Sequence, residues 1–353
     1  MHLLVLFGLL AKMVHSLSSP SSTTTTAAPS STSACIKILY AGKSEQYPSY
    51  EKGLLQTFQE IGLPSNSQVE LTDDISGMTQ DEIDYIIYNP SSALQDFSPY
   101  TNVKAVLSLR AGVDQESNNP TLSRDIPLTR LVDPGLRQGM IEYVVGHVLR
   151  YHLNTDRSWQ QNQQKDWISS DPPLARQCNV GILGLGELGG SCAEALLSLG
   201  FNVWGWSRTK KQKDGVQCCH GPGGLDQILQ VSDILVLLLP NTPETQNLMF
   251  EKTFSKCKPG ICIINAGRGN SIDDDDLLQA LKDGIVAGAT LDVFKEEPLP
   301  KEHPYWGHPN VLVTPHIAAK TRPETASKVL ADNIRRSEMG EQMLYIVDRG
   351  TGY

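Results

Sequence analysis

The stretch from Cys178 to Ser198 reads CNVGILGLGELGGSCAEALLS, and it decides the fold. Its apolar start is typical of a buried strand, its small-residue end is typical of a helix, and the turn between them has the pattern G-x-G-x-x-G. The first glycine allows a tight turn, the second lets the backbone approach a diphosphate, and the third brings helix against strand. The positive end of the helix then faces the phosphate charge. We predict a dinucleotide-binding turn, with a glycine-rich structural turn as the alternative, and its residues are Gly184, Leu185, Gly186, Glu187, Leu188 and Gly189.

The second strand of this unit bears on the choice of cofactor. An NAD-binding sequence carries an acidic residue about 20 residues after the turn, where it binds the ribose 2′-hydroxyl. Here residues 202–206 run instead into Ser207-Arg208-Thr209-Lys210-Lys211. Hydroxyls and cations suit a 2′-phosphate, which a guanidinium can grip with two hydrogen bonds. We predict that Ser207, Arg208 and Thr209 bind the cofactor, with NADP(H) preferred and NAD(H) possible. A solvated basic turn is the alternative.

Length and composition limit the classes of protein. A chain of 353 residues should hold about two domains. The net charge of −9 gives no support for a nucleic-acid partner, which usually needs a basic face. The seven cysteines are odd in number and lack paired metal-ligand spacing. We therefore expect a reduced protein without a metal site.

The N-terminal residues differ in composition from the rest. Leu3–Ala11 is apolar but too short to cross a bilayer as a helix, so we expect no membrane anchor. Residues 16–34 contain no charge and consist mostly of Ser, Thr, Pro and Ala. We interpret residues 1–34 as a targeting or disordered segment, with a misassigned start codon as the alternative. Import into a plastid or mitochondrion is the favoured location, and a cytoplasmic or secretory-routed protein stays open.

The remaining chain predicts two α/β domains. Near-continuous apolar strands that alternate with helices are typical of a doubly wound parallel sheet. Six such strands are predicted, at 179–183, 202–206, 234–239, 261–265, 288–293 and 311–314. A smaller α/β unit of flavodoxin-like type precedes them, with strands at 36–40, 83–88 and 103–109 and a helix at 50–61. A helical pattern at 324–339 should return to this smaller unit.

We place the domain limits accordingly. Residues 35–136 and 319–353 form the predicted substrate domain, and residues 137–318 form the predicted NAD(P)-binding domain. The stretch 140–167 is helical and then polar. It predicts either an arm that packs on a second subunit or a solvated linker.

Three ionisable residues follow successive predicted strands of the larger domain: Arg268, Glu297 and His316. Ligands of open α/β sheets bind outside the carboxyl ends of the strands. Reduction of a 2-oxo acid needs a proton on the carbonyl oxygen, and a protonated imidazole with a carboxylate beside it suits that task. An arginine can grip the substrate carboxylate and polarise the carbonyl. Three unrelated surface residues are the alternative.

Several blocks together resemble the D-isomer-specific 2-hydroxyacid dehydrogenases, and within them the bacterial-type glyoxylate/hydroxypyruvate reductase A group. The blocks are Gly184–Gly189, Asn265–Gly269, Leu291–Leu299, Thr314–His316, Ala111–Asp114, Leu239–Thr245, Trp206–Thr209 and Val347–Gly350. The resemblance covers residues 35–353 and is specific in this combination.

The resemblance implies roles for named residues. It implies that Arg268, Glu297 and His316 are catalytic, with His316 as the acid/base. It implies that the backbone at Ala111 and Gly112 holds the substrate carboxylate. The further cofactor residues that it implies are Leu239, Pro240, Thr242, Ala266 and Asp292. It also implies a homodimer and the reduction of glyoxylate to glycolate and of hydroxypyruvate to D-glycerate, for which the basic run after residue 206 favours NADPH.

One residue departs from the family pattern. Arg110 stands where the family commonly has glycine, directly before Ala111-Gly112. A positive φ there would strain an arginine. Otherwise its guanidinium could bind substrate or block the cleft. Phosphoglycerate-type and formate-type dehydrogenases and a non-catalytic, corepressor-like protein remain the rival functions.

Overall fold

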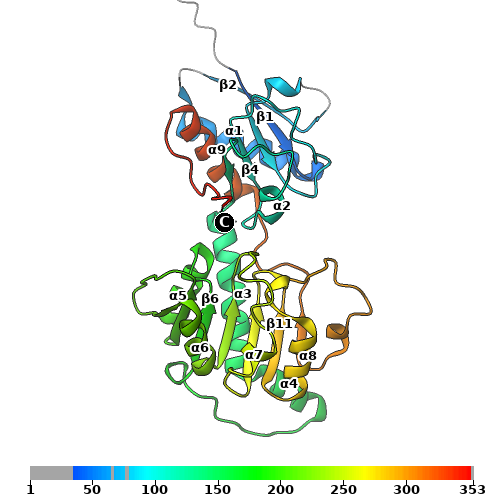
Figure 1. The fold of residues 1–353 in the computed structure, drawn as a ribbon, viewed down its shortest axis with the longest axis vertical. Coiled ribbons are helices and arrows are strands. Elements are labelled where there is room, and N and C mark those ends of the chain that lie inside the picture. The colour runs from blue at the N-terminus through cyan, green and yellow to red at the C-terminus, as the bar shows by residue number, and fades with distance from the viewer. Residues whose placement is uncertain (1–34, 65–66, 76–78, 351–353) are drawn as a thin grey trace, which may run out of the picture. The chain divides into compact units, whose positions relative to one another are not determined.

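The structure is a computed structural model, and it describes residues 35–64, 67–75 and 79–350. The predicted targeting segment lies outside these residues. Two parallel sheets organise the described chain (Figure 1). We call the smaller sheet and its helices the first lobe (residues 35–133 and 319–350), and the larger sheet with its helices the second lobe (residues 134–318).

The first lobe is built on a five-stranded sheet in the order β2-β1-β3-β4-β5, with every pair parallel. This is the flavodoxin-like order, which confirms the predicted class. Its strands are β1 (Cys35–Ala41), β2 (Gln68–Thr72), β3 (Tyr85–Tyr88), β4 (Ala105–Ser108) and β5 (Leu128–Thr129). Its helices are α1 (Tyr47–Ile61), α2 (Asp114–Ser117) and α9 (Pro323–Glu338).

The C-terminal helix α9 completes the first lobe, as predicted. Leu330 and Ile334 of α9 are buried in one cluster with Leu54 and Phe58 of α1 and with strand β1. Its apolar residues recur at helical spacing, and Pro323 occupies its first position, where the missing N–H has no helical partner to lose. The chain therefore crosses between the lobes twice.

The second lobe is a seven-stranded parallel sheet in the order β12-β11-β10-β9-β6-β7-β8. Strand order reverses between β6 and β9, and a dinucleotide binds at such a reversal in doubly wound sheets. The strands are β6 (Asn179–Leu183), β7 (Asn202–Ser207), β8 (Gln217–His220), β9 (Ile234–Leu237), β10 (Ile261–Asn265), β11 (Val286–Leu291) and β12 (Val311–Val313). The prediction of six strands missed β8, an edge strand with only one buried residue, Cys219.

Helices cover both faces of this sheet (Figure 1). On one face, Val144 and Val148 of α3 pack with α5 against Val180 and Ile182. On the other face, α6, α7 and α8 pack in a separate cluster. The helices are α3 (Pro134–His152), α4 (Thr155–Gln164), α5 (Glu187–Ser198), α6 (Gly221–Val231), α7 (Glu251–Phe254) and α8 (Asp274–Lys282). The predicted domain limit at 136/137 falls inside α3, and the predicted domain limits stay a prediction.

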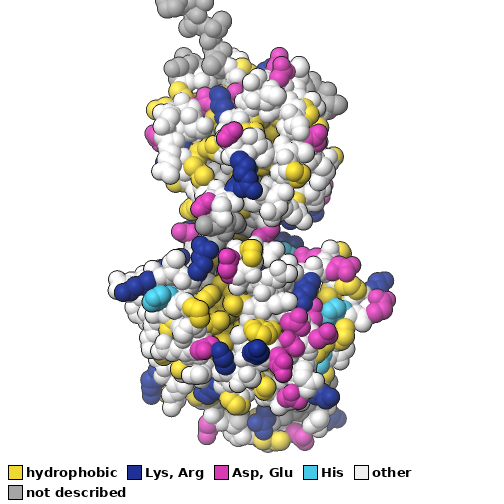
Figure 2. Space-filling model, in the orientation of Figure 1, with side chains coloured by type: hydrophobic (Ala, Val, Ile, Leu, Met, Phe, Trp, Pro, Cys, Tyr) yellow, Lys and Arg dark blue, Asp and Glu magenta, His cyan; other side chains and the backbone are white. Residues whose placement is uncertain are grey.

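The acidic run Asp273–Asp276 forms the start of α8. The Asp273 side chain accepts a hydrogen bond from the backbone N–H of Asp276, and the acidic first turn complements the helix dipole. Lys295 lies 3.5 Å from Asp274. Acidic side chains gather over this part of the second lobe (Figure 2).

The stretch after α3 carries exposed apolar side chains. Trp159 of α4 is 67% exposed and Trp167 is 99% exposed. This exposure fits an arm, but a second subunit stays a prediction. None of the helices in residues 35–64, 67–75 and 79–350 is both long and apolar enough to cross a bilayer.

Candidate active site

The glycine turn between β6 and α5 has the geometry that a dinucleotide requires. Gly184 has a φ of +105°, and a Cβ there would lie 2.5 Å from the carbonyl oxygen of Leu238. A Cβ on Gly189 would lie 1.9 Å from the carbonyl oxygen of Gly184, so helix and strand approach as closely as only glycine permits. A Cβ on Gly186 would meet nothing within 4 Å, because the backbone there faces open space. The turn thus fits the diphosphate of a dinucleotide.

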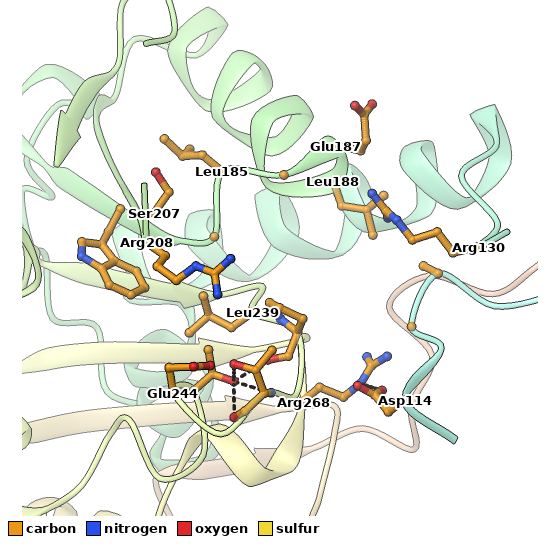
Figure 3. Close-up of a pocket in the computed structure, with 18 of the residues that line it drawn as sticks. Asp114, Arg130, Leu185, Glu187, Leu188, Ser207, Arg208, Leu239, Glu244 and Arg268 are labelled. Carbon is orange, nitrogen blue, oxygen red and sulfur yellow. Dashed lines mark hydrogen bonds and ion pairs between the residues drawn. The ribbon is translucent and has the colours of Figure 1, made fainter. Parts of the chain in front are cut away.

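A pocket lies along this turn and extends to both lobes (Figure 3). Among the predicted site residues, its lining includes Gly184, Leu185, Gly186, Glu187, Leu188, Ser207, Arg208, Thr209, Leu239, Pro240, Thr242, Ala111, Gly112 and Arg268. The lining also includes residues that sequence reasoning missed, namely Val113, Asp114, Arg130, Trp206, Lys211, Glu244 and Thr245. The predicted residues outside its lining are Gly189, Arg110, Ala266, Asp292, Glu297 and His316.

The end of β7 forms the basic side of the pocket. The Ser207 hydroxyl donates to the carbonyl oxygen of Thr209 at 2.8 Å, which tightens the turn after the strand. Lys211 donates to the carbonyl oxygen of Leu185 in the glycine turn at 3.0 Å. Hydrogen bonds from its own backbone N–H and from Thr242, together with the charge of Arg208, hold the pKa of Glu244 below its usual value. Lys211 belongs to the basic run at residues 207–211, so the sequence could have identified it as a residue that lines the pocket.

The structure brings Glu297 and His316 into contact. Nδ1 of His316 lies 2.7 Å from Oε2 of Glu297, and the backbone N–H of Phe294 donates to Oε1 at 3.0 Å. Burial acts to raise the pKa of Glu297. The hydrogen bonds from His316 and Phe294 and the charges of His316 and Arg268 outweigh burial, so the pKa of Glu297 is lowered. This pair can hold a proton at the imidazole beside an ionised carboxylate.

The turn that carries His316 is held by a buried carboxylate. Asp292, which is fully buried, accepts the backbone N–H groups of Ile317 at 2.8 Å and Ala318 at 2.9 Å, and the hydroxyl of Thr314 at 2.6 Å. His316 itself has a φ of +51°. A non-glycine residue in this region costs free energy, so the surrounding contacts must fix it. The predicted contact of Asp292 with cofactor stays a prediction.

Arg268 reaches from the second lobe to the first. Its Nε donates to Oδ2 of Asp114 at 2.7 Å, and its Nη1 donates to the carbonyl oxygen of Gly267 at 2.8 Å. A Cβ on Gly112 would lie 1.0 Å from Nη2, so only glycine leaves room for this guanidinium. Arg268 therefore lies against the predicted substrate loop, and Asp114 holds it there. Asp114 belongs to the block Ala111–Asp114, but a separation of 154 positions in the sequence does not predict its contact with Arg268.

A buried acid, Glu116, supports the start of the predicted substrate loop. The Ser108 hydroxyl donates to Glu116 at 2.7 Å and accepts the backbone N–H of Arg110 at 3.0 Å. Burial raises the pKa of Glu116. Arg110 is exposed and is not among the residues with a positive φ, so the backbone strain considered above is absent from this described position. Its contact with substrate stays a prediction.

Comparisons with known proteins agree with this geometry. The family model for the D-isomer specific 2-hydroxyacid dehydrogenase, NAD binding domain, matches residues 145–318. The chain is 45% identical over 256 residues to glyoxylate/hydroxypyruvate reductase A from Serratia proteamaculans, and the match covers 71% of this chain and 82% of the relative. In the described residues, no group of three or more His, Cys, Asp or Glu is placed to hold a metal ion.

Two solved structures share the fold. A D-isomer specific 2-hydroxyacid dehydrogenase from Xanthobacter autotrophicus Py2, in complex with NADPH and MES, has a TM-score of 0.83 and 36% identity, covering 91% of this chain and 100% of that one. The NADPH-dependent glyoxylate/hydroxypyruvate reductase from Sinorhizobium meliloti, in complex with NADP and sulfate, has a TM-score of 0.79 and 33% identity, with the same coverage.

The predicted organellar location is wrong. The curated relatives that the chain resembles are glyoxylate/hydroxypyruvate reductases of bacteria, which contain neither plastids nor mitochondria, so organelle import has no support. That prediction rested on the composition of residues 1–34, which lie outside the described residues, and on the expectation of a reduced nicotinamide enzyme.

The fold, the glycine turn and the sequence similarity all indicate the same family. The two parallel sheets match those of solved family members over 91% of the chain. The second lobe is an NAD(P)-binding domain. The chain belongs to the D-isomer-specific 2-hydroxyacid dehydrogenases, a family of nicotinamide-dependent oxidoreductases.

Proposed function

We propose that this enzyme reduces small 2-oxo acids with NADPH, glyoxylate to glycolate and hydroxypyruvate to D-glycerate first among them. The observation that carries the proposal is the 2.7 Å contact between His316 and Glu297, with the charge of Arg268 acting on the same carboxylate. Each of these residues follows a strand of the second lobe, which also carries the glycine turn that fits a diphosphate. The names of the Serratia and Sinorhizobium relatives support this substrate class.

The residues divide the chemistry among them. When bound, a reduced nicotinamide supplies the hydride for the carbonyl carbon. His316 uses Nδ1 to contact Glu297, which leaves Nε2 to give a proton to the carbonyl oxygen. Arg268 and the backbone at Ala111 and Gly112 hold the substrate carboxylate, and the guanidinium polarises the adjacent carbonyl. Glu297 favours the protonated imidazole and sets its orientation.

The direct test follows NADPH oxidation with a panel of 2-oxo acids and repeats it with NADH. We expect turnover with glyoxylate and hydroxypyruvate and a higher kcat/KM with NADPH. An enzyme that turns over none of the 2-oxo acids contradicts the proposed reaction. Preference for NADH contradicts only the proposed cofactor. We also propose a homodimer, which light scattering on the purified protein tests.

Replacing Arg208 with Gln should shift the cofactor preference. A charge-assisted hydrogen bond contributes about 1.5–3 kcal/mol, so we expect kcat/KM for NADPH to fall about 10- to 100-fold. The value for NADH should change by less than about threefold, because NADH lacks the 2′-phosphate. Steady-state kinetics with both cofactors measures the ratio. Equal losses with both would place Arg208 away from the 2′-phosphate.

Replacing Glu297 with Gln should change the pH dependence of reduction. The lowered pKa of Glu297 means that its carboxylate is charged at neutral pH and loses its charge only as the pH falls below its usual range. The neutral amide of the Glu297→Gln variant would no longer favour the protonated imidazole. The wild-type kcat/KM should fall at acid pH, as Glu297 takes up a proton below the usual range of a glutamate, and the variant, which is neutral at this position at every pH, should be slower and lack this acid limb. A variant whose pH profile, measured between acid and alkaline pH, matches that of the wild type contradicts this role.

A further inference from the structure

Arg130 extends from the first lobe toward the glycine turn of the second. It directly follows β5, and its backbone is fixed because its N–H donates to the carbonyl oxygen of Tyr345 at 3.0 Å. Its side chain lies beside Glu187 and Leu188 (Figure 3). It lines the pocket along the turn and a second, adjoining pocket. The residues common to both linings are Arg130, Leu185, Gly186, Glu187 and Lys211.

The guanidinium of Arg130 is partly buried, and its charge has no paired carboxylate among the described residues. Burial lowers its pKa, and the charge of Glu187 opposes that shift. Within residues 35–64, 67–75 and 79–350, no hydrogen bond or ion pair of this guanidinium is found, whereas Arg268 pairs with Asp114 and Arg137 pairs with Glu187. Partly buried cations are normally paired, because removal from water costs free energy that a partner must offset. The position therefore suits an anion that binds from outside the chain.

We infer that Arg130 binds the diphosphate of the nicotinamide cofactor and so links the first lobe to the glycine turn. The space over Gly186 is where the backbone lets a diphosphate approach, and Arg130 lines that same space. Glu187 places a negative charge beside the turn, so a cation there offsets its repulsion of a dianionic group. This inference rests on the proposed function, since it assumes a bound nicotinamide dinucleotide.

Two other anions already have cations of their own. The 2′-phosphate is expected at the end of β7, where Arg208 lies on the opposite side of the glycine turn from Arg130 (Figure 3). The substrate carboxylate is expected at Arg268 and the backbone of Gly112. Lys211 also lines the space over the glycine turn, but its ammonium donates to the carbonyl oxygen of Leu185, which leaves the guanidinium of Arg130 for the diphosphate.

The test measures equilibrium binding to the full-length protein without substrate. Three ligands are titrated into the wild type and the Arg130→Gln variant: NADPH, 2′-phospho-ADP-ribose and 2′-AMP. The first two contain the diphosphate and the third does not. Loss of one charge-assisted contact predicts a Kd about 10- to 100-fold higher for both diphosphate ligands. The Kd of 2′-AMP should stay within about twofold.

Controls separate this contact from a structural role. Lys328→Gln removes one exposed positive charge from the first lobe and should leave all three Kd values unchanged. The thermal midpoint of the ligand-free Arg130→Gln variant should be no lower than that of the wild type, because the guanidinium has no partner among the described residues to lose. Arg130→Lys keeps the charge without the fork and should restore part of the affinity. If the Arg130→Gln variant does not fold, the Arg130→Lys variant is compared with the wild type in the same titrations.

Three outcomes would overturn the inference. An equal loss for 2′-AMP would assign Arg130 to the 2′-phosphate or to structure. Unchanged nucleotide affinities with a raised KM for glyoxylate would assign it to the substrate. If the three Kd values and the KM for glyoxylate are all unchanged, Arg130 binds neither the cofactor nor the substrate. If the wild type instead prefers NADH, the proposed cofactor fails separately, and the same comparison runs with ADP-ribose and adenosine.

Discussion

Replacing His316 with Asn should lower kcat for glyoxylate reduction about 100- to 10,000-fold, the range over which a positioned general acid acts. Asn suits this position because His316 has a φ of +51°, a conformation that Asn adopts more readily than most residues. The turn should therefore survive, held by the hydrogen bonds from Ile317 and Ala318 to Asp292. Stopped-flow or steady-state kinetics at saturating NADPH measures the loss.

Binding measurements define what this loss means. The Kd of NADPH should stay within about twofold, because general acid catalysis does not require the imidazole for ground-state binding. His220→Gln is a matched control: this exposed histidine lies at the end of β8 and should leave kcat unchanged. A His316→Asn enzyme with wild-type kcat would remove His316 from the chemistry. Retained biological effect without turnover would favour the corepressor-like alternative.

The sequence predicted the features that local pattern encodes. The glycine turn was predictable because its glycines answer local demands, and the structure shows close contacts at Gly184 and Gly189 and open space over Gly186. The two-sheet fold was predictable because buried parallel strands appear as apolar runs. Strand β8 was missed because an edge strand paired only with β7 needs no such run.

Contacts between distant residues left no trace in the sequence. Asp114 and Arg268 lie 154 positions apart, and their contact depends on how the two lobes fold. Glu116 stands in a polar stretch, yet the fold buries it against Ser108, where it supports the substrate loop. Arg130 likewise looked like any surface arginine. Only three-dimensional structure shows a partly buried cation without a partner among the described residues.

Replacing Arg268 with Lys should lower kcat/KM for glyoxylate about 100- to 1,000-fold, although the charge is kept. The guanidinium contacts Asp114 through Nε, Gly267 through Nη1 and the substrate loop through Nη2 at the same time. An ammonium is a compact charge without this planar fork, so it cannot hold these directions together. Both kcat and KM should worsen, because the proposed contacts act on the carboxylate and on the developing charge at the carbonyl.

A double-mutant cycle with Asp114→Asn tests whether the two residues act as a unit. The Asp114→Asn variant would keep a hydrogen-bond acceptor but lose the charge that holds the guanidinium against Gly112. If Asp114 acts only by positioning Arg268, the double variant should lose little more than Arg268→Lys alone, since coupled residues are not additive. Multiplicative losses would show that Asp114 acts independently of Arg268. An Arg268→Lys enzyme within about threefold of wild-type kcat/KM would mean that this guanidinium does not bind the substrate, because a bidentate contact is not replaced by lysine.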